Sequence, residues 1–334
     1  MPIDRAIAFI DRNSRHIRCT SLASIASGWM NISSRHCRNY TLNCWICAPL
    51  GHNLIPVEIV VYFWQPRINL MNLLDYRFSK YSQAGQEGII LHILKMLNVT
   101  KGVFVEFGAW NGIKYSNCRL LAEKDWRGLF IEKSKKAFEE LQNNTRQFRK
   151  VICYRGSVKL SGYNQFDNII KRTLGNIRID ICSIDIDGPD FEIFETFSQN
   201  LPLIICIEGG QMLVPHHPRL PATLSKKNLQ QSLQVMSQSF AAKGYSPVCS
   251  YQDTFFVKSE HALLFNVGDT TTLYFEGLEA SQGRLPWISR KLKKNGLKNP
   301  IIDFVLKQSN GKGENIKEII ILAERMYRSG LLRE

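Results

Sequence analysis

The sequence contains no apolar run long enough to cross a membrane as a helix. Its longest, Leu54 to Trp64, is about half of the ~20 residues that a span needs, and Glu58 interrupts it. The first residues also lack a secretory signal, because Asp4 and Asp11 flank a short apolar patch and no small-residue cleavage site follows. These absences predict a protein with no transmembrane segment.

A paired cysteine framework is absent as well. The chain has nine cysteines, an odd number without the regular spacing of a secreted disulfide scaffold. Cys153, Cys182 and Cys206 lie inside apolar runs, where cysteine behaves as a small buried hydrophobe. We therefore expect a reducing, cytoplasmic setting.

Charge is plentiful but not concentrated. The formal net charge is +14, which favours anionic partners in general. The basic residues are scattered, and aromatic residues do not alternate with them as on a surface that stacks single strands. The densest groups are Lys133, Lys135 and Lys136, and then Arg290, Lys291, Lys293, Lys294 and Lys298. This pattern favours a solvated basic face over nucleic-acid binding.

Residues 1–70 contain no lysine and show no sustained helical or strand period. One hypothesis for them is a small zinc module, because Cys44-Trp-Ile-Cys47 is followed by His52; the fourth ligand would fall on Val57, which cannot bind metal. The alternative is an irregular or disordered extension, or a mis-assigned start with true initiation at Met71. We expect three parts: this extension, a catalytic domain over 71–258 and a helical appendage over 259–334.

After Met71, short apolar segments alternate with amphipathic ones. The segments expected as strands are 103–107, 128–132, 151–154, 179–185 and 203–208, each followed by a helical pattern, with a terminal hairpin over 245–251 and 254–257. Such alternation predicts an α/β fold: a doubly wound, mostly parallel sheet with helices on both faces.

Several predicted strands end in a carboxylate, which needs a reason because unpaired buried charge is costly. The first ends Glu106-Phe-Gly108-Ala109-Trp-Asn-Gly112, a Glu-x-Gly-x-x-x-Gly pattern rather than the Gly-x-Gly-x-x-Gly of a dinucleotide site. Glu132 ends the second strand, where a carboxylate can accept hydrogen bonds from both hydroxyls of a ribose. A glycine bend beside carboxylates suits S-adenosylmethionine (SAM), which is a cationic nucleoside without phosphate.

An ordered series of motifs resembles the FkbM family of SAM-dependent methyltransferases over residues 79–258. It consists of Ser82-Gln-Ala-Gly-Gln-Glu-Gly88, the Val103–Gly112 run, Ser116-Asn117, Trp126–Glu132, Ser183–Asp190 and Ile207-Glu208. The resemblance implies a class I, Rossmann-like methyltransferase fold with an antiparallel terminal strand. It also implies O-methylation of a hydroxyl on a small molecule, a sugar or a lipid-linked glycan.

The resemblance places the cofactor at Glu106, Gly108, Gly112 and Glu132, and we add Ala109 and Asn117 from the same motifs. The third strand ends Tyr154-Arg-Gly-Ser157 without the acid that many methyltransferases direct toward adenine. This departure leaves the adenine contact to a backbone amide or to the Ser157 hydroxyl.

Asp185 and Asp187 are the candidate catalytic residues, because strand alternation places both on one side. They could hold Mg²⁺ together with Glu208, or one could act as a general base. The alternative is structural, with Asp190 capping a helix and Asp187 shaping a turn. His216, in a Pro-rich loop, is a further candidate base or metal ligand; a solvated loop is its other interpretation.

Two other classes of function stay open: an enzyme that binds a nucleotide-sugar or NAD, and a non-catalytic interaction module on the same fold. The sequence does not define the role of 259–334, for which a lid and the arm of a homodimer are the two hypotheses.

Overall fold

The structure is a computed structural model. It describes residues 72–332 apart from 226–228, 266–267 and 310–314, together with the backbone of four strands nearer the N-terminus. The chain divides into two compact units, Met1–Leu70 and Met71–Glu334.

The first unit contains β1 (Ala6–Ile10), β2 (Arg18–Cys19), β3 (Thr41–Cys47) and β4 (Leu54–Phe63), which form a sheet in the order β2-β1-β4-β3. These strands occur where the sequence shows no regular period. The proposed zinc ligands Cys44, Cys47 and His52, and the proposed start at Met71, lie outside the residues whose side chains are described.

The second unit is built on a seven-stranded sheet in the order β10-β11-β9-β8-β5-β6-β7. Its strands are β5 (Val103–Phe107), β6 (Arg127–Glu132), β7 (Val151–Arg155), β8 (Ile181–Ile184), β9 (Ile204–Glu208), β10 (Tyr245–Ser250) and β11 (Asp253–Lys258). Neighbouring strands are parallel from β7 through β6, β5 and β8 to β9. In contrast, β11 is antiparallel to both of its neighbours, β9 and β10. The predicted doubly wound, mostly parallel sheet with an antiparallel terminal strand is confirmed.

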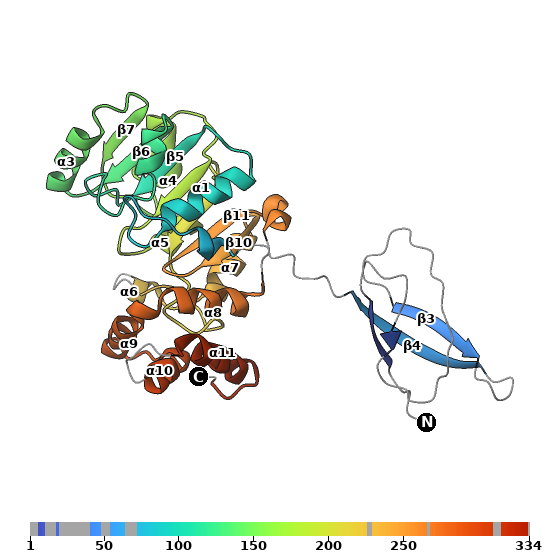
Figure 1. Cartoon of the computed structure of the whole chain (residues 1–334). Coiled ribbons are helices and arrows are strands. Elements are labelled where there is room, and N and C mark those ends of the chain that lie inside the picture. Colours follow the sequence, from blue (N-terminus) through green and yellow to red (C-terminus); the bar gives the residue numbers. More distant parts are fainter. Residues whose placement is uncertain are drawn as a thin grey trace. The chain divides into compact units, whose positions relative to one another are not determined.

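Helices cover both faces of this sheet (Figure 1). The first core combines sheet residues such as Phe104 and Phe130 with α1 (Gln86–Met96), α2 (Arg119–Glu123) and α3 (Lys135–Thr145). The second combines the alternate strand residues with α4 (Phe166–Thr173), α5 (Asp190–Glu195) and α7 (Leu233–Ala241). The central strands β5, β8 and β9 therefore bury both faces, as their continuous apolar runs predict, whereas the edge strand β7 has no fully buried residue.

A third core belongs to the C-terminal segment, whose short turns and helices are η2 (Ser259–Leu264), α8 (Thr270–Ala280), η3 (Gln282–Arg284), α9 (Leu285–Lys294), α10 (Pro300–Gln308) and α11 (Ile316–Arg328). Helix α8 packs on β10, and these helices gather at the β10–β11 end of the sheet (Figure 1). They also enclose apolar residues between β9 and α7, among them Met212 and Leu213, next to the short helix α6 (Ala222–Ser225). No helix in the described part of the chain is both long and apolar enough to span a membrane.

Candidate functional site

Carboxylates collect on one face of the sheet at the ends of its central strands. Glu106 is paired in register with Phe130 on β6 and with Ser183 on β8, so it shares the face of the first core. Glu132 follows Phe130 by two residues on the same face. Glu208 pairs with Asp253 across β9 and β11, two residues beyond the Cys206–Phe255 pair of that core. The alternation of each strand therefore brings these acids to one rim.

Glu106 is buried and fastens the loop that follows its own strand. Its carboxylate accepts hydrogen bonds from the Ser116 hydroxyl (2.7 Å) and from the backbone N–H groups of Asn117 (2.8 Å) and Cys118 (3.2 Å). Burial raises the pKa of Glu106 to about 7, although these three donors oppose the rise. These three hydrogen bonds position the loop before α2, and a contact between Glu106 and a cofactor stays a prediction.

Glu132 joins the end of β6 to the bend after β5. One carboxylate oxygen accepts from the Trp110 N–H (2.9 Å) and the other from the Ser134 N–H (2.6 Å). The Ala109 N–H donates to the carbonyl of Ile131 (3.1 Å), one residue before Glu132. Two residues of the bend are thus held against the end of β6, so the bend and the predicted ribose carboxylate lie together.

The two glycines of the bend are required by packing within the protein. Gly108 has a φ of +67°, and a Cβ there would lie 1.8 Å from the carbonyl oxygen of Asp185. Gly112 has a φ of +70°, and a Cβ there would lie 2.5 Å from Leu141 of α3. The sequence explained these glycines by close approach to a ligand, whereas contact with Asp185 just after β8 and with α3 accounts for both. The Gly108 contact also places the bend at the junction of β5 and β8, where the strand order reverses and ligands of open α/β sheets bind.

Asn117 is buried, and part of its amide has no partner. Its Nδ2 donates to the Ser183 hydroxyl (3.0 Å), while its Oδ1 has no hydrogen-bond partner. Ser157 lies beyond the end of β7, one residue after Gly156, whose N–H donates to the carbonyl of Glu132 (3.0 Å). Both predicted residues therefore sit on the same rim as Glu132, and their contact with a cofactor stays a prediction.

The structure brings the three predicted metal ligands together. One carboxylate oxygen from each of Asp185, Asp187 and Glu208 lies within 4.8 Å of the other two. Oε2 of Glu208 is buried and has no hydrogen-bond partner. Asp187 has a φ of +55°, so it also shapes the turn after β8, and Asp190 accepts from the N–H groups of Ile186 and Gly188. Asp190 therefore holds this turn and does not cap α5, whose N-cap residue is Pro189, whereas Asp185 and Asp187 each bring a carboxylate oxygen close to Glu208.

The crowding of these acids changes their titration. Although the Asp185 side chain reaches solvent, the surrounding protein raises its pKa by desolvation, and the charges of Asp253 and Asp190 add to the rise. Desolvation also raises the pKa of Glu208, to which the charge of Asp185 contributes. Burial raises the pKa of Asp190 to about 6. At neutral pH this rim therefore favours a proton or a cation between its carboxylates.

The sequence analysis missed four residues that support this rim. Asp253 is buried beside Glu208 and accepts from the Gln86 amide (2.5 Å), which α1 contributes. Desolvation raises the pKa of both Glu208 and Asp253, and the charge of Arg284 in η3 opposes this rise. Burial lowers the pKa of Lys291 on α9, while the charges of Glu208 and Asp187 oppose that change. Of these four residues, only Asp253 could have been found from the sequence. It is the first residue of the hairpin strand β11, and a hairpin strand that pairs with β9 places that residue opposite Glu208.

His216 contacts the C-terminal segment. Its Nδ1 is 2.8 Å from the Tyr327 hydroxyl of α11, and the two rings stack at 5.9 Å between centroids. Among the described residues, the group that could hold a metal comprises Asp185, Asp187 and Glu208 and does not include this histidine. The structure thus ties His216 to the C-terminal helices.

No family model matches the sequence, and no curated protein matches it. Membership of the FkbM family therefore stays a prediction. Solved structures that resemble this one include a putative caffeoyl-CoA O-methyltransferase from Staphylococcus aureus (19% identity, 52% of this chain and 82% of that chain, TM-score 0.36). A putative O-methyltransferase from Klebsiella pneumoniae (13%, 56% and 89%, 0.35) and the N-terminal domain of EvdMO1 with SAH bound (10%, 53% and 82%, 0.38) are also similar.

These TM-scores are too low to assign a residue or a reaction to this chain. Its fold class follows from its own strands. Counted along the second unit, they lie in the order 3-2-1-4-5-7-6, with the seventh antiparallel. This is the class I, Rossmann-like methyltransferase arrangement that the sequence predicts.

Replacement of Gly108 by alanine should destabilise the protein more than the strain of a left-handed backbone alone would. Gly162 has a similar φ of +80°, but a Cβ added there would meet no atom within 4 Å, so Gly162→Ala serves as the matched control. We expect Gly108→Ala to lower the free energy of unfolding by at least about 2 kcal/mol more than Gly162→Ala. Urea denaturation of both variants measures this difference, and equal losses would contradict the contact with Asp185.

Glu106 should make the protein less stable as the pH rises. Its pKa is raised from 4.5 to about 7 in the folded protein, so the unfolded chain ionises first and stability is lost between these pH values. The contribution is about 3 kcal/mol. Glu106→Gln, which does not titrate, should flatten the change in the free energy of unfolding from about pH 4.5 to 7 relative to the wild type. An identical pH profile for the two proteins would show that the pKa of Glu106 is not raised.

Proposed function

We propose that this chain is a SAM-dependent methyltransferase that methylates an acceptor hydroxyl. One observation carries the proposal: the Trp110 N–H in the bend after Gly108 donates a hydrogen bond to Glu132. This bond lies at the point where the strand order of the sheet reverses. This is where an open α/β sheet binds its ligand, and the carboxylate lies at the strand end suited to ribose hydroxyls.

The residues present fit the cofactor in two further ways. Asn117 has a buried Oδ1 without a partner beside the bend, which leaves an acceptor for an N–H or O–H group. The acids of the rim give negative surroundings that suit a sulfonium and an ammonium group. The same charge disfavours a pyrophosphate, which supports SAM over NAD or a nucleotide-sugar.

When bound, SAM supplies an activated methyl group for transfer to an acceptor oxygen, whose proton is lost while the thioether is released. The chain's own task is then to align that oxygen and to receive its proton. Asp185 is suited to the second task, because its raised pKa lets it accept a proton near neutral pH and its side chain reaches solvent. Glu106 holds the loop before α2, which carries Asn117. Asp190 holds the turn after β8, which carries Asp185.

Mg²⁺ at these acids is the alternative to Asp185 as a general base, because a bound cation would lower the pKa of a carboxylate that holds it. Carboxylate oxygens are its preferred protein ligands, and it is usually held by one or two carboxylates while it retains waters. Asp185, Asp187 and Glu208 offer three oxygens within 4.8 Å, and Glu208 has an unpartnered buried oxygen. A divalent cation there would also relieve the repulsion between these acids and would make the acceptor hydroxyl more acidic.

Titration of the full chain with SAM in a calorimeter tests the cofactor. We expect saturable binding to the wild type and about tenfold weaker binding to Glu132→Gln, because one charge-assisted hydrogen bond is lost. Glu139→Gln is the matched control, since Glu139 lies exposed on the neighbouring helix α3, where it pairs with Lys135. No heat of binding at about millimolar SAM would refute the proposal, and preferred binding of NAD or a nucleotide-sugar would replace it. SAM binding without turnover of any acceptor would favour an interaction module.

The metal is tested by Mg²⁺ titration followed by thermal unfolding. At a pH near 8 we expect Mg²⁺ to raise the unfolding midpoint of the wild type, because it neutralises carboxylates that desolvation and mutual repulsion destabilise. Asp187→Asn should lose most of this shift, whereas Asp75→Asn, which changes an exposed acid of η1 (Leu73–Tyr76), should keep it. An equal shift in all three proteins would exclude this rim as the metal site.

A further inference from the structure

The segment that follows α8 carries positive charge without an acid of its own. Between Ala280 and Ile302 the sequence has no aspartate or glutamate, and it has six basic residues: Arg284, Arg290, Lys291, Lys293, Lys294 and Lys298. Helix α9 contains four of these six. A surface that gathers one sign of charge in this way attracts partners of the opposite sign.

Helix α9 presents much of this charge on one side. Its buried side is formed by Leu285, Ile288 and Leu292, which belong to the third core. Four residues at positions i, i+3, i+4 and i+7 lie within about 100° of one another on the opposite side of the helix. We call these four residues the α9 face: Trp287, Arg290, Lys291 and Lys294. Lys291 is half-buried, and the other three are exposed.

The cations of the α9 face are not neutralised by ion pairs within the described part of the chain. There, the acid that pairs with a cation of α9 is Asp303, which lies 3.1 Å from Nζ of Lys293, outside this face. The charges of Glu208 and Asp187 act on Lys291, but neither carboxylate forms an ion pair with it. The face therefore keeps its positive charge available to a partner.

Trp287 places an aromatic ring among these cations. The residue is 39% exposed. Cζ of Arg284 lies 5.0 Å from the centre of a Trp287 ring, and Nζ of Lys291 lies 4.7 Å from it. Cations over the ring leave it poorly placed to stack on a base, which is how proteins hold single-stranded nucleic acid. An amphipathic ring beside lysine and arginine is instead typical of the polar boundary of a bilayer.

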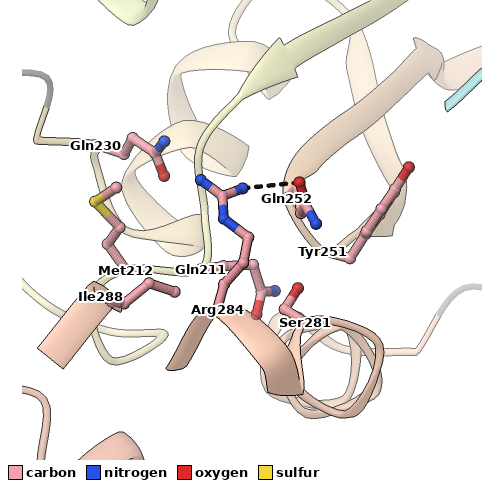
Figure 2. A pocket seen from close by; sticks show the side chains of 8 residues that line it. All are labelled: Gln211, Met212, Gln230, Tyr251, Gln252, Ser281, Arg284 and Ile288. Atoms are coloured by element: carbon pink, nitrogen blue, oxygen red, sulfur yellow. Dashed lines mark hydrogen bonds between the residues drawn. The ribbon is translucent and has the colours of Figure 1, made fainter. Parts of the chain in front are cut away.

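The inner side of this segment is closed against the sheet. Figure 2 shows Arg284 and Ile288 there, where they line a small pocket with Met212 and Gln252. Nη1 of Arg284 donates to Oε1 of Gln252 (2.9 Å), so this cation is directed toward the turn between β10 and β11. Because its apolar side is buried, α9 cannot insert into a bilayer as a free amphipathic helix does. It can contact a charged surface only through the α9 face.

We propose that the α9 face docks on the surface of a bilayer that contains anionic lipids. Its three cations would lie among the headgroups, with the Trp287 ring at their boundary. Each cation near such a surface strengthens binding about fivefold, so three contribute about a hundredfold. Because Lys291 also lies within reach of the rim's charges, docking would bring the acidic rim close to the headgroups. The inference does not rest on the proposed function, since it involves neither SAM nor an acceptor.

Co-sedimentation of the full chain with lipid vesicles tests the docking surface. One set of vesicles is phosphatidylcholine alone, and the other contains phosphatidylcholine and phosphatidylserine in a ratio of about three to one. We expect the wild type to bind only the anionic vesicles and to be released at about 0.5 M salt, which screens exposed charges. Arg290→Gln combined with Lys294→Gln should weaken binding about thirtyfold.

Lys135→Gln combined with Lys136→Gln is the matched control. It removes the same charge from two exposed residues of α3, which packs on β7 at the opposite end of the sheet from β10. We expect this variant to keep the affinity of the wild type. Equal losses in the two double variants would overturn the inference, because binding would then follow the net charge of the chain. Equal binding of the wild type to neutral and anionic vesicles would overturn it as well.

Trp287→Phe separates contact with the bilayer from attraction at a distance. Brominated lipids quench a tryptophan that touches them, so we expect them to quench part of the wild-type emission that Trp287→Phe lacks. Equal fractional quenching in the two proteins would contradict docking through this face. Tighter binding of the wild type to a short RNA, single-stranded or duplex, than to anionic vesicles would also overturn the inference and would assign the surface to nucleic acid.

Discussion

The repulsion between acids at one rim of the sheet is the constraint on which the rest of the second unit depends. Glu106, Asp190 and Asp253 are buried there, and each is held by donors from another segment: the loop before α2, the turn after β8 and the start of α1. Because a buried carboxylate without donors is very costly, these loops cannot relax independently of the sheet. The same acids that demand this support give the rim its affinity for protons and cations.

The sheet could be predicted closely because its signals are local. The strand predicted over 103–107 matches β5, and those predicted over 128–132 and 203–208 differ from β6 and β9 by one residue at the start. The strand predicted over 179–185 ends at Ile184, so Asp185 and Asp187 come together with Glu208 through the turn after β8 and not through strand alternation. No local pattern could join Gln86 to Asp253 or bring Arg284 beside Glu208, because those pairings depend on how distant helices pack.

The glycines and His216 show where a motif supports two physical explanations. A glycine bend after a strand fits a bound nucleoside, yet at Gly108 and Gly112 the space for a Cβ is already taken by Asp185 and Leu141. The sequence cannot separate close approach of a ligand from close approach of a neighbouring strand or helix, since both require the absence of a side chain. His216 was proposed from its place in a loop near the rim, but the aromatic contact with Tyr327 sets its direction.

The C-terminal helices change the electrostatics of the rim as well as its shape. They bring Arg284 and Lys291 to acids that the sheet alone would leave facing one another, so part of the charge is compensated from outside the methyltransferase fold. This compensation is incomplete, because desolvation still raises the pKa of Glu208 well above its ordinary value. The rim is thus partly neutralised by fixed cations and still favours a proton or a cation between its carboxylates. The helices therefore belong to the same electrostatic unit as the sheet, since the charge balance at the rim includes their residues.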